Sequence, residues 1–167
     1  MPEGETLLGF APVWNKDIRI LVLGSMPSAL SLERGQYFAN PRNAFWPIAF
    51  DSFAQPLETE YGARLRFLLE RGIGLWDAAA SCQRRGSLDS AMRQVRLNDF
   101  APLFAACPAL KTVLCNGSKA FALFARAVRG RDLRARALCL PSTSPALASL
   151  SYGQKLAAWA PYLREER

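Results

Sequence analysis

The segment at positions 37–43 concentrates side chains that could bind a ligand. Its seven positions include Tyr37, Phe38, Asn40, Arg42 and Asn43. Exposed aromatic rings beside amides are costly for a folded protein to keep unless they hold a ligand. We therefore expect a binding site here, in which an amide can both accept and donate hydrogen bonds.

Two of these residues also have a purely structural interpretation. Asn43 precedes the apolar run AFWPIAF and could serve only as the N-cap of a helix, a position that asparagine favours. Phe38 could be a core residue, as aromatic side chains often are. Phe45 and Trp46, at the start of the same helix, are expected to be buried. The density of amides and rings in this one loop favours a functional role for Asn43 and Phe38.

The chain contains no histidine. This excludes Ser-His-Asp and Cys-His hydrolase chemistry and the usual histidine-based metal sites. Catalysis must therefore use amides, carboxylates, hydroxyls, lysine, backbone groups or water.

The apolar pattern predicts strands that alternate with helices. Continuous apolar runs predict buried strands at residues 18–23, 73–76, 111–115 and 137–140. Helices are expected at residues 43–53, 61–71, 89–106, 118–128 and 152–164. Such alternation is typical of a parallel sheet that is covered on both faces, and it places the chain in the α/β class.

Loops rich in Gly, Ser, Pro and Asn follow three of the expected strands. They read GSMPS at 24–28, NGSKA at 116–120 and PSTSPA at 141–146. Ligands of parallel α/β proteins bind beyond the carboxyl ends of the strands. We therefore expect the three loops to converge on one rim and to form the site.

The length and charge of the chain limit the number of domains and the kinds of partner that we expect. At 167 residues, the chain fits one domain that spans residues 1–167. Its 21 basic and 14 acidic residues give a net charge of +7, which favours a polyanionic partner without requiring one. No apolar stretch is long enough to cross a bilayer, and the N-terminus is acidic where a signal peptide is basic. We expect a cytoplasmic monomer that does not bind membranes.

The four cysteines are scattered and include no C-x-x-C pair. Cys115 and Cys139 lie in runs that are expected to be buried strands. Small reduced thiols explain this pattern better than disulfides, zinc or an iron–sulfur cluster. We expect no metal and no cofactor.

Several segments resemble one family of enzymes. The run YFANPRNAFW at 37–46, preceded by GSMPS, is similar to the first motif region of mismatch-specific uracil/thymine glycosylases and hypoxanthine-DNA glycosylases. Both groups belong to the uracil-DNA glycosylase superfamily. The later segments LWD (75–77), RGSLD (85–89), NG (116–117) and PSTSP (141–145) agree in order. The resemblance implies a three-layer α/β/α sandwich around a four-stranded, mainly parallel sheet, and an enzyme that flips deaminated bases out of DNA.

The resemblance also implies roles for individual residues. Phe38 is at the position whose ring stacks on the flipped base. Asn43 is at the position of the catalytic asparagine of the hypoxanthine branch, where it would orient a water and support the cationic sugar. Asn116 could hydrogen-bond the base edge, although Asn-Gly is also a common turn. The expected substrate-binding set is completed by Gly24, Ser25, Met26 and Asn40.

Met26 departs from the pattern of the mismatch-specific relatives. These enzymes hold the attacking water with an amide in the Gly-x-Asn-Pro position of the first loop, and a methionine cannot do so. The hypoxanthine branch shares this absence. The sequence therefore favours hypoxanthine over uracil as the excised base, with water as the nucleophile.

The segment at 141–147 resembles the second motif, which presses on the DNA backbone. Its hydroxyls and N–H groups would contact phosphates, and Leu147 could be the apolar wedge that enters the gap left by the flipped base. The expected DNA-binding residues are Ser28, Ser142, Thr143, Ser144, Pro145 and Leu147.

Two carboxylates are secondary candidates, since a carboxylate can activate water. Asp77 ends an expected strand at the same rim as the site. Asp89 follows Gly-Ser-Leu and is interpreted as the N-cap of the next helix.

Three other functions compete with excision of hypoxanthine. A uracil/thymine mismatch glycosylase would share the motifs. A non-catalytic module that binds lesions in DNA is compatible with Met26. A serine or nucleotide hydrolase built on GSMPS would lack a base, because the chain has neither histidine nor a Ser-x-x-Lys motif.

Overall fold

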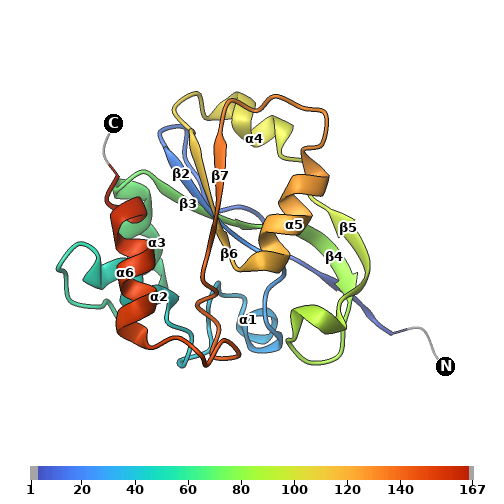
Figure 1. Cartoon of the computed structure of the whole chain (residues 1–167), viewed down its shortest axis with the longest axis horizontal. Helices are drawn as coiled ribbons and strands as arrows, with labels where there is room; N and C mark the ends of the chain where they lie inside the picture. Colours follow the sequence, from blue (N-terminus) through green and yellow to red (C-terminus); the bar gives the residue numbers. More distant parts are fainter. Residues whose placement is uncertain (1–3, 166–167) are drawn as a thin grey trace.

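The computed structural model describes residues 4–165 and is built on a parallel sheet (Figure 1). Four parallel strands lie in the order β3-β2-β6-β7. Their bounds are β2 Ile20–Gly24, β3 Ile73–Asp77, β6 Thr112–Asn116 and β7 Arg136–Leu140. The four expected strands are thereby confirmed, each within a few residues of its expected bounds.

A second sheet extends from the first. Its three antiparallel strands, in the order β1-β4-β5, are β1 Thr6–Leu8, β4 Ala79–Gln83 and β5 Arg93–Leu97. Only Ala78 separates β4 from β3, so the chain passes directly from one sheet into the other. The sequence pattern did not predict this sheet.

Helices cover both faces of the parallel sheet (Figure 1). On one side lie α2 Phe45–Asp51, α3 Tyr61–Glu70 and α6 Tyr152–Leu163. On the other side lie α4 Ala101–Ala106 and α5 Ser118–Ala127. The short helix α1, Ala29–Arg34, lies at the lower edge of the view. The arrangement confirms the three-layer α/β/α sandwich.

The central strand β2 shows why the sandwich has two cores. All five of its residues are buried. Ile20 and Val22 face the core beneath α2, α3 and α6, whereas Leu21 and Leu23 face the core beneath α4 and α5. Successive side chains of a strand point to opposite faces, so an uninterrupted apolar run fits a strand that is covered on both sides. Full burial of each such side chain contributes about 1.5–3 kcal/mol.

The helix expected at residues 89–106 is wrong. The segment instead forms a single 3-10 turn (η1, Asp89–Ala91), then β5, and only afterwards the short helix α4. Residues of β5 alternate in exposure and pair with β4 through an irregular register, with Gln94 at a φ of 51°. The helix-compatible residues Arg, Gln and Leu therefore yield to a tertiary pairing that a local pattern does not reveal.

Cys139 also differs from its expected environment. It is exposed, whereas Cys82, Cys107 and Cys115 are buried. β7 lies at the edge of the parallel sheet, and the Cys139 side chain is not covered there.

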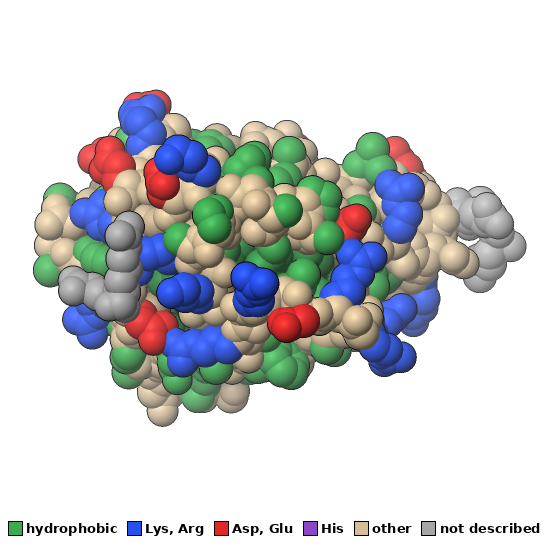
Figure 2. Space-filling model, turned by 90° about the horizontal axis from the view of Figure 1, so that it is seen from above, with side chains coloured by type: hydrophobic (Ala, Val, Ile, Leu, Met, Phe, Trp, Pro, Cys, Tyr) green, Lys and Arg blue, Asp and Glu red, His purple; other side chains and the backbone are tan. Residues whose placement is uncertain are grey.

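Figure 2 shows the molecule from above the view of Figure 1, and on this face basic side chains are mixed with acidic ones. The net charge of +7 therefore does not single out this face as a binding surface. Within residues 4–165, no helix is long and apolar enough to cross a membrane.

Candidate active site

A cavity of about 680 Å³ opens where the parallel strands end. The loops after β2, β6 and β7 all border it, as the sequence predicted. Of the expected site residues, only Thr143 does not line the cavity. The others are Gly24, Ser25, Met26, Ser28, Phe38, Asn40, Asn43, Asn116, Ser142, Ser144, Pro145 and Leu147.

Phe38 forms part of the cavity wall in a strained backbone conformation. Its φ of 55° lies in the left-handed region, which a bulky residue rarely adopts and which costs on the order of 1–3 kcal/mol. The ring packs against Phe45, with the centroids 4.2 Å apart and the planes at 31°. Phe45 is fully buried, whereas Phe38 is only half-buried and borders the cavity. The backbone thus holds one aromatic ring between the core and open space.

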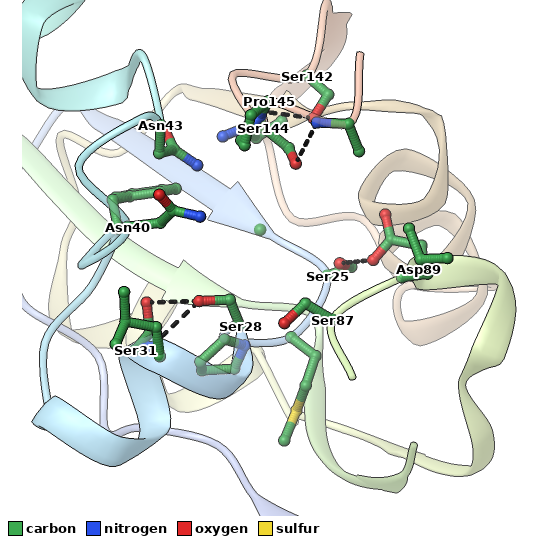
Figure 3. A pocket seen from close by; sticks show the side chains of 18 of the residues that line it. Ser25, Ser28, Ser31, Asn40, Asn43, Ser87, Asp89, Ser142, Ser144 and Pro145 are labelled. Carbon is green, nitrogen blue, oxygen red and sulfur yellow. Dashed lines mark hydrogen bonds between the residues drawn. The ribbon is translucent and has the colours of Figure 1, made fainter. Parts of the chain in front are cut away.

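Asn40 and Asn43 lie together on one wall of the cavity (Figure 3). Asn43 Oδ1 accepts a hydrogen bond from Phe45 N–H at 2.9 Å, and Asn40 Oδ1 accepts one from Arg42 N–H at 3.0 Å. Both oxygens thereby fix the loop backbone. No described residue accepts from the amide nitrogen of either side chain, and both nitrogens are turned toward the cavity.

The hydrogen bond of Asn43 bears on its interpretation as a helix cap. The N-cap of α2 is Ala44, which makes no side-chain capping bond. Asn43 lies one residue earlier and satisfies an N–H group of the first turn of the helix. Its side-chain oxygen therefore caps the helix by accepting from Phe45 N–H, while its NH₂ group remains available to a ligand.

Tyr37 is not an exposed ring of this loop, contrary to expectation. It is 4% exposed. Its hydroxyl donates to the carbonyl of Ala11, its carbonyl accepts from the indole of Trp46, and its N–H donates to Tyr61 Oη. Tyr37 anchors the loop from beneath, and Phe45 and Trp46 are buried as expected.

Asn116 and Thr143 join two of the loops. Asn116 Nδ2 donates to Thr143 Oγ1, and Thr143 N–H donates to Asn116 Oδ1, both at 2.8 Å. The carbonyl of Thr143 accepts from Ala44 N–H at 3.0 Å, which ties in the third loop. Thr143 is fully buried, so its expected contact with a DNA phosphate is wrong for the side chain.

The loop at 24–28 is held from several directions. Ser25 Oγ donates to Asp89 Oδ1 at 2.5 Å, and Ser28 Oγ caps α1 by accepting from Ser31 N–H. Met26 is 7% exposed and belongs to one of the two cores, and it also borders the cavity. The hydroxyls of Ser25 and Ser28 thus already have partners within the protein.

The segment at 84–90 forms a further wall that the sequence pattern did not predict. Ser87, Leu88 and Asp89 border the cavity. Arg84, 9% exposed, donates to the carbonyls of Gly86 and Pro27 and so fastens this segment to the loop at 24–28. Asp89 begins the 3-10 turn and holds Ser25, rather than capping a longer helix. The RGSLD motif is the signal for this wall in the sequence, and its interpretation as the start of a long helix is wrong.

The segment at 141–147 rests on α6. Trp159 Nε1 donates to the carbonyl of Pro141, and Lys155 Nζ donates to the carbonyl of Ser144. Lys155 is 5% exposed, and its burial lowers the pKa of the ammonium group. Ser142 and Ser144 use their hydroxyls to accept N–H groups within the loop. Leu147 is half-buried at the cavity edge.

Asp77 is one of the residues that line the cavity, and it lies at the end of β3. It is 4% exposed, and burial raises the pKa of its carboxyl to about 7. Arg84 lowers this pKa and Asp89 raises it, each by a smaller amount. A carboxyl with a pKa near 7 in a cavity is suited to acid–base chemistry at neutral pH.

The fold and the site define an α/β protein with a cavity at the carboxyl edge of its sheet, bordered by the half-buried ring of Phe38 and by the amide nitrogens of Asn40 and Asn43, which have no partner among the described residues. Residues 11–164 match the uracil DNA glycosylase superfamily. The chain belongs to this superfamily.

Relatives and a solved structure agree with this membership. The chain is 37% identical over 112 residues to a hypoxanthine DNA glycosylase of Methanosarcina barkeri, a match that spans 66% of this chain and 71% of the relative. It is also 37% identical over 113 residues to one of Methanosarcina acetivorans, spanning 67% and 72%. A solution NMR structure of a uracil DNA glycosylase candidate from Methanosarcina acetivorans superposes with a TM-score of 0.83 at 32% identity, covering 96% of this chain and 98% of that one.

Proposed function

We propose that the protein is a monofunctional DNA glycosylase that excises hypoxanthine from deoxyinosine in DNA. The observation that carries this proposal is the half-buried ring of Phe38, held against Phe45 at the edge of the cavity. A flat heterocycle that enters the cavity can stack on this ring, which is worth roughly 1–3 kcal/mol per base. The similarity to two hypoxanthine DNA glycosylases supports the same choice of substrate.

Asn43 is proposed to position the attacking water. Its Oδ1 already accepts from Phe45 N–H, and an amide oxygen has a second lone pair for a water proton. Its free NH₂ group can at the same time donate to the sugar or to the base. The hydrogen bond to the helix fixes the orientation of the amide, so this positioning needs little reorganisation during the reaction.

Asn116 is proposed to act on the substrate indirectly. Both of its polar atoms hydrogen-bond Thr143, so the amide holds the second motif in place. We propose that it positions the loop at 141–147, rather than reading the base edge.

DNA is proposed to lie across the rim formed by the loops at 24–28 and 141–147. Ser142, Ser144 and Pro145 border the cavity there, and backbone N–H groups can contact phosphates without reading sequence. Leu147 is proposed to fill the gap in the base stack.

Water is proposed as the nucleophile. None of the described residues that line the cavity is a lysine, the side chain that forms a Schiff base in enzymes with a lyase step. The products are then free hypoxanthine and an intact strand with an abasic site.

Single-turnover cleavage tests this function. Matched duplexes carry deoxyinosine, deoxyuridine, deoxyxanthosine or an undamaged base at one position, and alkali then cuts the strand at abasic sites. We expect release of hypoxanthine to be fastest. Faster release of uracil would assign the chain to the mismatch-specific branch. Tight binding to the lesion without any alkali-sensitive product would make it a non-catalytic lesion-binding module.

A further inference from the structure

The carboxyl of Asp77 occupies a space that the backbone leaves open. Asp77 pairs with Gly24 at the carboxyl ends of β3 and β2. A Cβ added at Gly24 would collide with Asp77 Oδ1, so only glycine lets the carboxyl lie against β2 at this point. Both residues line the cavity. The carboxyl therefore lies against the end of β2, in a residue that lines the cavity.

This carboxyl has no hydrogen-bond partner among the residues that the structure describes. Asp77 Oδ2 is fully shielded from solvent and unpaired, and the carbonyl of the same residue is the atom that accepts from Asn98 Nδ2. Arg84 donates through Nε and Nη2 to two backbone carbonyls, and its Nη1 is also buried without a partner among the described residues. Within residues 4–165 no hydrogen bond or ion pair joins the guanidinium to Asp77. A buried polar group without a partner is expensive and indicates an interaction completed by a proton or a ligand.

The surroundings of Asp77 favour its neutral form up to neutral pH. Burial is the largest cause and raises the pKa of the carboxyl to about 7. The negative charge of Asp89, on η1, acts in the same direction, and the positive charge of Arg84, beyond β4, opposes both. Tyr37, in the loop at 37–43, has a pKa that is raised mainly by its own burial and further by the negative charge of Asp77. Its hydroxyl donates a hydrogen bond to the carbonyl of Ala11.

Building on the proposed function, we propose that protonated Asp77 is the general acid that delivers its proton to N7 of the flipped hypoxanthine. A purine offers N7 as an acceptor, and protonation there removes the negative charge that would otherwise develop on the departing base. A neutral carboxyl can donate to N7, while an ionised one can only accept.

The step balances as a hydrolysis. The bond between C1′ and N9 breaks, and its electron pair stays on the base. The proton moves from Asp77 to N7, so hypoxanthine leaves as a neutral molecule. The oxygen of water bonds to C1′ and loses one proton to solvent, and the Asp77 carboxylate regains a proton from solvent. Asn43 then acts on the attacking water, and Asp77 acts on the departing base.

The wild-type protein provides the first test. Single-turnover rates are measured from pH 6 to pH 8 on duplexes with deoxyinosine or 7-deaza-deoxyinosine, which has a carbon in place of N7. We expect the deoxyinosine rate to fall roughly tenfold across this range, because the protonated fraction of a group with a pKa near 7 falls by that factor. We expect the 7-deaza substrate to be cleaved at least tenfold more slowly at pH 6. Equal rates on the two substrates overturn the proposal.

Asp77→Asn provides the second test, because it keeps the size of the side chain and removes the transferable proton. We expect the deoxyinosine rate at pH 6 to fall at least tenfold and to become independent of pH between 6 and 8. Asp17→Asn, an exposed carboxylate outside the cavity, is the control for a change in net charge. Thermal unfolding and affinity for undamaged duplex verify that the variant is folded.

The outcomes separate this inference from the function on which it rests. If the wild-type protein releases no hypoxanthine, the proposed function is wrong. If it releases hypoxanthine at a rate that is flat with pH and unchanged in Asp77→Asn, the glycosylase stands and the role of Asp77 is refuted.

Discussion

Asn116 and Thr143 hold each other through two hydrogen bonds of 2.8 Å, one in each direction. Asn116 ends β6, and Thr143 lies in the loop after β7, so the pair joins loops that follow neighbouring strands. The carbonyl of Thr143 then accepts from Ala44 N–H, next to Asn43. Three loops of the cavity are therefore joined through the buried residue Thr143.

The first prediction separates positioning by Asn116 from direct contact with the base. Asn116→Ala leaves the buried hydroxyl and N–H of Thr143 unpaired, which costs roughly 1–3 kcal/mol of stability. Thr143→Val removes the same hydroxyl from the other side of the pair. If Asn116 acts through Thr143, both variants should lower the cleavage rate, and the double variant should lose less than the sum of the two. Urea unfolding and single-turnover cleavage give the two readouts. A large loss of rate in Asn116→Ala alone would instead indicate contact with the base.

The second prediction concerns Asn43. Asn43→Ala should lower single-turnover cleavage at least tenfold, or about 1.4 kcal/mol of barrier, with little change in affinity for lesion DNA. The control is Asp99→Ala, because Asp99 Oδ1 accepts from Ala101 N–H at the start of α4, in the same i to i+2 geometry but outside the cavity. This variant also removes the exposed ion pair with Arg131, which contributes little to stability. Both variants should lose about 1 kcal/mol of stability, and only Asn43→Ala should lose activity. Equal activity in the two would reduce Asn43 to a capping residue.

The third prediction concerns Phe38. Phe38→Tyr and Phe38→Trp retain a π-face and should retain most of the activity, whereas Phe38→Leu should lose roughly 1–3 kcal/mol of stacking on the base. Phe45→Leu is the control, because Phe45 is fully buried and should lose stability through poorer packing. Thermal unfolding and cleavage rates distinguish the two positions. Should Phe38→Leu unfold the protein as readily as Phe45→Leu does, Phe38 is a core residue.

The sequence predicted the parts of the fold that depend on local pattern. A continuous apolar run such as that of β2 can be satisfied only when both faces of the strand are covered, so it predicts a parallel sheet between helices. The topology of such a sheet places the ends of β2, β6 and β7 at one edge. The convergence of three loops on one cavity follows from these two facts.

Other features depend on contacts between distant segments. β5 is a strand because it pairs with β4, although its residues are equally compatible with a helix. Tyr37 can be buried because residues distant in the sequence complete its hydrogen bonds. Tyr61 Oη and the carbonyl of Ala11 accept from it, and Trp46 Nε1 donates to it. Asn116 resembled a residue that faces the substrate, and only its partner Thr143, 27 residues away, shows where its amide is used.

The last prediction follows from the ionisation of Asp77. Burial raises the pKa of its carboxyl to about 7, well above the value of 3.8 for a free side chain. A group whose pKa is raised in the folded state stabilises the fold below its unfolded pKa, and this contribution is lost as pH rises through the folded pKa. Between pH 5 and pH 8 the wild-type protein should therefore lose roughly 3 kcal/mol of stability through this group, at 1.36 kcal/mol per pKa unit. Asp77→Asn cannot ionise, so its stability relative to the wild-type protein should rise by that amount over the same range. Urea unfolding of both proteins at pH 5 and pH 8 measures the difference, in which all other titrating groups cancel. A difference that does not change with pH would show that the carboxyl of Asp77 is already ionised at pH 5 and cannot hold a proton for a leaving group.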